Sequence, residues 1–77
     1  MQKSPSLAKL IKFHRKKAQL TQTRLAELAG VGKTTVFDLE NGKINVQFNI
    51  ILSILEILNV KLFFESPIMH LMENENV

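Results

Sequence analysis

The sequence predicts a small all-α domain of four or five helices, with one short β-strand towards its C-terminal end. Three observations predict this class. The chain has 77 residues, of which 45% are apolar, so it can form one core and no more. Apolar side chains repeat at helical spacing in several segments between residues 5 and 58. The chain has no cysteine, which excludes a disulfide framework, a zinc–thiolate site and a Cys nucleophile.

The first predicted helix begins at Ser4-Pro5, because serine can cap a helix and proline is tolerated at the first helical position. One face of the following segment carries residues that repeat at helical spacing: Leu7, Ile11, His14 and Ala18. The opposite face carries a stripe of lysines: Lys9, Lys12 and Lys16. We interpret His14 as a half-buried core residue, since it lies on the apolar side of this helix. His14 and His70 are too far apart in sequence for a recognised metal spacing.

A second helix is predicted over Gln22–Ala29, with Thr21 as its cap and Gly30 as the left-handed residue that ends it. Its expected core side consists of three residues: Leu25, Leu28 and Ala29. A third helix is predicted over Lys33–Asn41, with two residues facing inward: Val36 and Leu39. Its outward face, at positions i, i+1, i+4 and i+5, carries four residues: Lys33, Thr34, Phe37 and Asp38.

The second half of the chain is expected to hold a loop over 44–46 and a fourth helix over Gln47–Leu58, although residues 44–50 also alternate as in a strand. Residues 60–65 alternate and are predicted to form a strand, which Ser66-Pro67 ends. Polar residues interrupt the apolar stretch Ile44–Phe64, so it cannot span a membrane. The first residues show no signal peptide, and we expect a cytoplasmic protein.

Charge is divided unevenly between the two halves. Residues 1–43 carry nine basic and three acidic side chains, whereas residues 44–77 carry one and four. A basic half is typical of a surface that faces a polyanion, and a solvated lysine-rich helix face fits equally well.

The two helices that flank residues 29–32 form the signature of a helix-turn-helix. Ala29 is small enough for the helices to cross closely, Gly30 permits a positive φ, and Val31 fills the wedge between them. Such a pair presents its second helix as a ridge that fits a DNA major groove about 12 Å wide.

The segment 21–43 resembles the XRE/Cro-repressor family. The matching hallmarks recur at fixed spacing: Thr21-Gln22, Leu25-Ala26, Ala29-Gly30-Val31, Thr35, Leu39, Glu40 and Gly42. With the flanking helices, the resemblance covers residues 6–58 and implies a lambda-repressor-like fold. The ending Ile50–Phe64 is similar to HipB-type antitoxins, in which a last helix leads into a strand that pairs with the same strand of a second subunit.

We therefore expect one domain over residues 1–77. Within it, residues 5–58 are the helix-turn-helix DNA-binding domain, 59–65 a dimerisation strand and 66–77 a flexible apolar and acidic tail. The residues expected at the dimer interface are apolar: Ile54, Ile57, Leu58, Val60, Leu62, Phe63 and Phe64. The alternative is a strand that folds back on its own helices.

The resemblance also implies roles for individual residues. Gln22 occupies the position that contacts a phosphate and braces the recognition helix, while Lys33 and Thr34 occupy base-edge positions. Thr35 matches a hydroxyl that reaches phosphate. Two residues fall where the following loop meets the DNA backbone: Asn41 and Lys43. Arg15 and Glu40 match a largely buried ion pair.

Position 32 is usually serine in this family, and Gly32 loses the side-chain contact. Specificity is then expected to depend more on the outward face of the third helix. Phe37 could pack on a thymine methyl and Asp38 could accept from cytosine N4, although simple surface packing is an equal alternative for both.

The resemblance implies a homodimeric repressor on a palindromic DNA operator. A HipB-like protein would also bind a HipA-type serine/threonine kinase toxin and repress its own operon. The alternatives are a stand-alone XRE-type regulator and a protein-interaction module that does not bind DNA. A phosphate-binding loop at Gly32-Lys33-Thr34 is unsupported, because it needs glycine where Glu27 stands. No catalytic set, metal or cofactor is expected.

Overall fold

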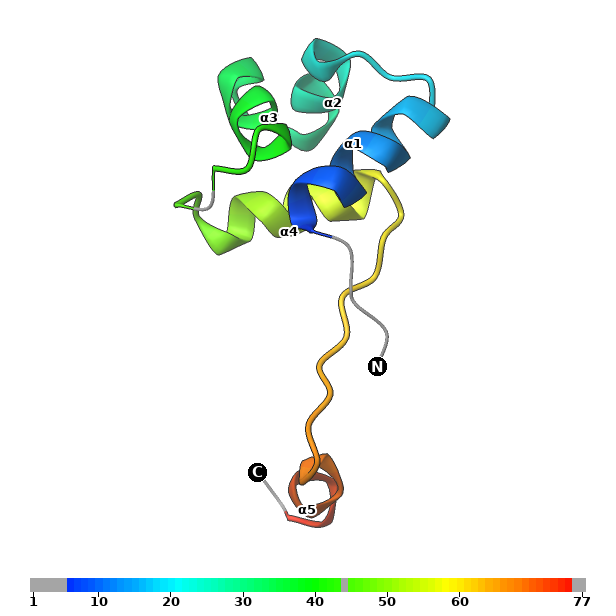
Figure 1. Cartoon of the computed structure of the whole chain (residues 1–77), viewed down its shortest axis with the longest axis vertical. Coiled ribbons are helices and arrows are strands. Elements are labelled where there is room, and N and C mark those ends of the chain that lie inside the picture. Colours follow the sequence, from blue (N-terminus) through cyan, green and yellow to red (C-terminus); the bar gives the residue numbers. More distant parts are fainter. Residues whose placement is uncertain (1–5, 44, 76–77) are drawn as a thin grey trace.

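Four helices pack around one core, and a fifth stands apart from them at the end of an extended segment (Figure 1). The computed structural model describes residues 6–43 and 45–75. The helices are α1 (Leu7–Lys17), α2 (Gln22–Ala29), α3 (Lys33–Glu40), α4 (Phe48–Ile57) and α5 (Met69–Asn74). Helix α2 packs against both α3 and α4, and α1 packs against α3. The all-helical class is confirmed for the described residues.

The first two helices begin at side chains that cap them. Ser6 accepts a hydrogen bond from the Lys9 amide at 3.2 Å, and Thr21 accepts one from the Arg24 amide at 3.0 Å. These caps satisfy amides that have no partner inside a helix. The predicted cap Ser4 lies outside the described residues, and the observed cap Ser6 places the start of α1 at Leu7.

The core consists of eight apolar side chains contributed by all four packed helices: Ile11, Leu25, Ala26, Val36, Leu39, Ile54, Leu55 and Leu58. Val36 and Leu39 are buried, as predicted, and they turn the opposite side of α3 towards solvent. Leu28 was predicted to belong to the core, but it is 42% exposed. A helix turns about 100° per residue, so Leu28 lies about 110° from the middle of the buried Leu25–Ala26 face.

Both α1 and α4 end in a non-glycine residue with positive φ. Gln19 has φ of 60° and Asn59 has φ of 59°. In each case the next amide turns back to the helix: Leu20 donates to the Arg15 carbonyl at 3.1 Å and Val60 to the Leu55 carbonyl at 2.9 Å. This arrangement is the Schellman motif, in which a left-handed residue closes the helix.

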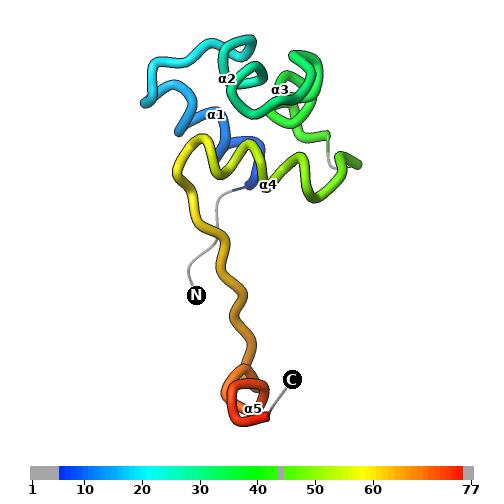
Figure 2. Tube along the Cα trace, turned by 180° about the vertical axis from the view of Figure 1, so that it is seen from behind, coloured from blue at the N-terminus to red at the C-terminus, as the bar shows by residue number. Residues whose placement is uncertain are grey.

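Residues 60–66 run away from the packed helices as an extended segment, which we call the arm (Figure 2). No strand is formed among the residues that the structure describes, since a strand needs a neighbour and this single chain supplies none. The segment 66–77, predicted to be a flexible tail, contains α5, whose six residues are all outside the core.

The predicted dimerisation residues divide into two groups. Ile54 is fully buried and Leu58 is 9% exposed, so both belong to the core of one chain and their assignment to an interface is wrong. The remaining five lie at the end of α4 and in the arm. Val60 packs partly against the core, while the side chains of Ile57, Leu62, Phe63 and Phe64 are exposed.

Candidate nucleic-acid interface

The turn between α2 and α3 fixes the angle at which α3 leaves the body. Gly30 ends α2 in the left-handed conformation, with φ of 71° and ψ of 32°. The Val31 amide then donates back to the Ala26 carbonyl at 2.9 Å, and Val31 packs against the core. The extended residue Gly32 begins α3 without a side-chain cap. The α2–turn–α3 unit is therefore closed by backbone bonds and one apolar wedge.

Helix α3 presents a ridge of side chains opposite its buried face. Lys33 and Thr34 are exposed in its first turn, and Phe37 is 52% exposed one turn further. Thr35 and Asp38 are half-buried at the two edges of this ridge. A cationic group, two hydroxyls and an aromatic ring thus stand on one exposed helix, and these groups can donate to phosphates or base edges and pack on a methyl group.

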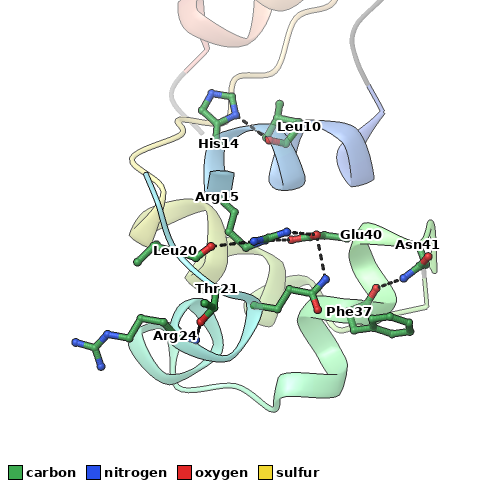
Figure 3. A network of polar contacts seen from close by, with 10 residues as sticks. Leu10, His14, Arg15, Leu20, Thr21, Arg24, Phe37, Glu40 and Asn41 are labelled. Carbon is green, nitrogen blue, oxygen red and sulfur yellow. Dashed lines mark hydrogen bonds and ion pairs between the residues drawn. The ribbon is translucent and has the colours of Figure 1, made fainter. Parts of the chain in front are cut away.

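An ion pair joins the last turn of α1 to the last residue of α3 (Figure 3). Arg15 Nε lies 2.6 Å from Glu40 Oε2, and Arg15 Nη2 donates to Glu40 Oε1 at 3.0 Å. The Arg15 side chain is 11% exposed and that of Glu40 is 3% exposed. Arg15 Nη1 also donates to the Leu20 carbonyl at 2.8 Å, so one guanidinium holds both α3 and the connection before α2.

Gln22 adds a third member to this network. Its Nε2 donates to Glu40 Oε1 at 3.1 Å, which connects the first residue of α2 with the last residue of α3. Every buried side-chain nitrogen and oxygen in the described part of the chain has a hydrogen-bond partner. A fully satisfied polar network of this kind fixes a geometry more than it adds net stability.

The network changes the ionisation of its two charged groups. Burial by itself would raise the pKa of Glu40, but hydrogen bonds from Arg15 and Gln22, with the positive charges of Arg15 and Lys12, hold this pKa below its ordinary value. The hydrogen bond to Glu40 likewise raises the pKa of Arg15, against the desolvation of the guanidinium. Both groups are therefore charged across the neutral range.

A second, more exposed ion pair flanks the ridge. Lys43 Nζ lies 3.5 Å from Asp38 Oδ2, and the Lys43 amide donates to the Asp38 carbonyl at 3.0 Å. Asn41 donates from Nδ2 to the Phe37 carbonyl at 2.8 Å. In the free protein, Asp38 thus has a cation beside it, while the side chains of Asn41 and Lys43 are exposed after α3.

Sequence patterns did not reveal the bond from Gln22 to Glu40 or the bond from Arg15 to the Leu20 carbonyl. The bond from Arg15 to the Leu20 carbonyl depends on the Schellman motif that ends α1. A glycine at position 19 would have indicated that motif in the sequence, but the residue there is Gln19. His14, which was interpreted as half-buried, is half-buried in the structure, and its Nδ1 lies 2.8 Å from the Leu10 carbonyl.

No group of three or more metal-ligating side chains occurs within residues 6–43 and 45–75. No described helix is both long and apolar enough to cross a membrane.

Helices α2 and α3 are joined by a short turn that Val31 fills, and α3 presents an exposed ridge of side chains. This arrangement defines a helix-turn-helix protein. The helix-turn-helix family model matches residues 11–64, and the chain belongs to this XRE-type family. No curated protein matches it.

Solved structures extend the likeness to HipB. One is described as a complex of HipA, HipB, O2 and O3, and another as a complex of a HipB variant with an O2 20mer. Each has 27% identity to this chain and a TM-score of 0.73, and each match covers 87% of this chain. The match covers 99% of the solved chain in the first structure and 97% in the second. A structure named MDT Protein matches equally, with 27% identity, a TM-score of 0.73, and coverage of 87% and 99%. The resemblance to HipB-type proteins is therefore confirmed.

Proposed function

We propose that this protein is a sequence-specific DNA-binding repressor that acts as a homodimer on a palindromic operator. The observation that carries the proposal is the exposed ridge of α3, which begins at Lys33 and is locked from behind by the Arg15–Glu40–Gln22 network. A ridge held in this way enters a major groove without rearrangement of the helix pair.

Within the ridge, we assign Lys33 and Thr34 to base edges and Thr35 to a phosphate. Phe37 would pack on a thymine methyl, and the exposure of its ring beside these polar groups supports this assignment. Asp38 would accept from cytosine N4 after Lys43 moves from the carboxylate to a phosphate. Asn41 and Gln22 would donate to the DNA backbone on either side of the ridge.

Charge supports the same partner. Nine of the ten basic residues lie within residues 1–43, the half of the sequence that contains α1, α2 and α3. Neutralising phosphates releases counterions, so log affinity should fall linearly with log salt, with a slope of about −0.9 for each phosphate contacted. A salt-independent affinity would contradict this electrostatic assignment.

We further propose that the protein is the HipB-like antitoxin of a toxin–antitoxin operon, which binds a HipA-type serine/threonine kinase and represses its own transcription. The likeness to a HipB chain solved together with HipA supports this assignment. The alternative is a stand-alone XRE-type regulator. Co-expression with a HipA-type kinase, where the neighbouring gene encodes one, separates them: a stable complex on a sizing column supports the antitoxin, and separate elution supports the alternative.

The exposed apolar arm favours a protein interface in addition to DNA binding. Phe63 is 79% exposed and Phe64 72% exposed, and the arm has unpaired backbone groups. Pairing residues 60–65 of two copies around a two-fold axis would satisfy these groups and cover one phenylalanine of each copy. The dimer would then place two α3 helices about 34–36 Å apart.

Selection of bound duplexes from random DNA tests the proposed function directly. We expect enrichment of a palindrome whose half-sites lie about one helical turn, or a multiple of it, apart. The matched pair of variants is Lys33→Ala in the ridge and Lys61→Ala in the arm, of which only the first should change the selected sequence. No enrichment in low salt would contradict the proposed function.

A further inference from the structure

Helix α5 and the residue before it present an apolar face that the described part of the chain leaves largely exposed. Ile68, Leu71 and Met72 stand at positions i, i+3 and i+4, and they are 63%, 50% and 54% exposed. Because a helix of six residues is unstable in water on its own, a surface that buries this face must stabilise it. The arm holds α5 away from its own packed helices (Figures 1 and 2).

A groove suited to such a face lies at the other end of the arm. It runs between the last turns of α4 and the start of the arm, has a volume of about 430 Å³, and is lined mainly by Leu52, Leu55, Glu56, Asn59, Val60 and Leu62. Leu52 is 40% exposed and Leu62 is 46% exposed, so the groove has an apolar wall open to solvent.

The direction of the arm determines which α5 can reach this groove. If the arms of two copies pair in antiparallel fashion around a two-fold axis at Phe63, residue 66 of one copy lies opposite residue 60 of the other. The chain then leaves the pair beside Asn59 of the other copy. Three more residues, about 10 Å of chain, bring the start of α5 to the last turns of the other copy's α4.

We propose that α5 of each copy docks in the groove beside α4 of the other copy, so that the dimer exchanges its arms. The inference rests on the homodimer of the proposed function and adds a second, separate contact to it. Ile68, at the start of α5, and Leu71 and Met72 within it meet the apolar wall of the groove, and both surfaces leave water together.

Charge selects the orientation of the docked helix. Lys61, which also lines the groove, is the only basic residue after position 43, and α5 carries Glu73 one residue after its apolar face. Glu56 stands on the same groove and repels Glu73 if the helix is seated the other way. Seating with Glu73 near Lys61 and away from Glu56 is therefore favoured.

Disulfide trapping tests the exchange, because the chain has no cysteine of its own. A Leu52→Cys chain is mixed with an isotopically labelled Met72→Cys chain and oxidised, and the product is weighed under non-reducing conditions. We expect a crosslinked species that contains one chain of each kind. Thr34→Cys, on the exposed ridge of α3, replaces Leu52→Cys as the control and should give at least tenfold less mixed product.

A yield of mixed disulfide no higher than that of the control would overturn the exchange. A chain that carries both Leu52→Cys and Met72→Cys gives a second check: closure of the disulfide within one chain at high dilution would also overturn the exchange. A second measurement does not depend on oxidation: Leu71→Asp should weaken dimerisation at least tenfold, whereas His70→Asp on the opposite face of α5 should change it less than twofold. Equal effects of the two variants would also overturn it.

DNA retardation by the unmodified protein reports on the proposed function independently. If the protein binds a palindrome as a dimer and yet no mixed disulfide forms, only the exchange of α5 is wrong. If it neither dimerises nor retards DNA, the proposed function fails together with the exchange.

Discussion

Arg15 donates three hydrogen bonds that tie α1 to the end of α3 and to the connection before α2. Two of them reach the same carboxylate, which requires the planar fork of a guanidinium. Lysine would place one point charge there and could not hold Glu40 and Leu20 together. The geometry of the ridge thus depends on a residue in a helix that does not belong to the helix-turn-helix.

Arg15→Ala is expected to lower the free energy of unfolding by about 3 kcal/mol or more, because it leaves the buried Glu40 carboxylate without its cation. Urea unfolding followed by circular dichroism measures this loss. The matched double variant Arg15→Met with Glu40→Leu removes both charges and should be much closer to the unmodified protein. A double variant as unstable as the single one would contradict this explanation.

The lowered pKa of Glu40 predicts the response of stability to acid. A carboxyl whose folded pKa lies below its unfolded value contributes stability that is complete above the unfolded pKa, about 4.3, and is lost as pH falls through the folded pKa. We therefore expect a loss of stability below about pH 4, measured by urea midpoints between pH 2 and 7. Glu40→Gln should be less stable at neutral pH and should lose less on acidification.

Gln19→Gly is expected to raise the free energy of unfolding by about 0.5–1 kcal/mol. Gln19 has φ of 60°, where a side chain is strained and glycine is not. Asn59 has the same conformation, but asparagine tolerates it better, so Asn59→Gly should gain less. Thermal unfolding of both variants checks the order, and a larger gain at position 59 would contradict it.

At the scale of the elements, caps and periodicity were sufficient to predict three helices closely. The sequence predicted α2 with its observed bounds, α3 one residue longer and α4 one residue longer at each end. Thr21, Gly30 and the inward Val36 and Leu39 carried this information, because each acts through local geometry or one apolar face. The start of α1 differs from the prediction, because Ser6 provides the cap and the helix begins at Leu7.

The C-terminal elements were harder to predict, since their conformation depends on what lies outside the chain. Alternation over residues 60–65 indicates a strand, but one chain provides no neighbour to pair with it. The spacing of Ile68, Leu71 and Met72 is a helical signal that was available, yet the short apolar run followed by acidic residues was interpreted as a tail. The exposed ridge followed from helical periodicity, whereas the bond from Gln22 to Glu40 depends on side-chain rotamers and could not be derived.

Helices α2 and α3 are expected to contribute differently to DNA binding. Lys33→Ala should cost about 1–3 kcal/mol on the preferred site and relax one base preference, because the proposed base-edge donor is lost. Gln22→Ala should weaken all duplexes alike, because Gln22 steadies the end of α3 and is proposed to contact phosphate. Retardation assays on selected and random duplexes measure both effects, and an equal loss on both duplexes for both variants would contradict the division of roles.

The whole molecule is elongated, with extents of 43 × 28 × 23 Å, because the arm and α5 extend beyond the packed helices. Basic side chains concentrate in the half that contains the ridge, and exposed apolar side chains concentrate in the arm and α5. One end of the molecule therefore has the chemistry of a polyanion-binding surface, and the other has that of a protein interface.

Phe63→Asp is expected to convert the proposed dimer to a monomer without loss of helical content, because Phe63 is 79% exposed and contributes nothing to the core of one chain. Sedimentation or light scattering gives the mass, and circular dichroism gives the helix content. The matched variant Phe13→Asp changes a residue of α1 that is 56% exposed and should remain dimeric. An unchanged mass for Phe63→Asp would contradict pairing of the arms.

The position of Glu40 at the end of α3 has a consequence for the kinetics of recognition. Its bonds to Arg15 and Gln22 hold α3 in place before the protein meets DNA. Little conformational entropy of α3 therefore remains to be lost when a duplex binds. Discrimination between operators should then appear in how long a complex lasts rather than in how fast it forms.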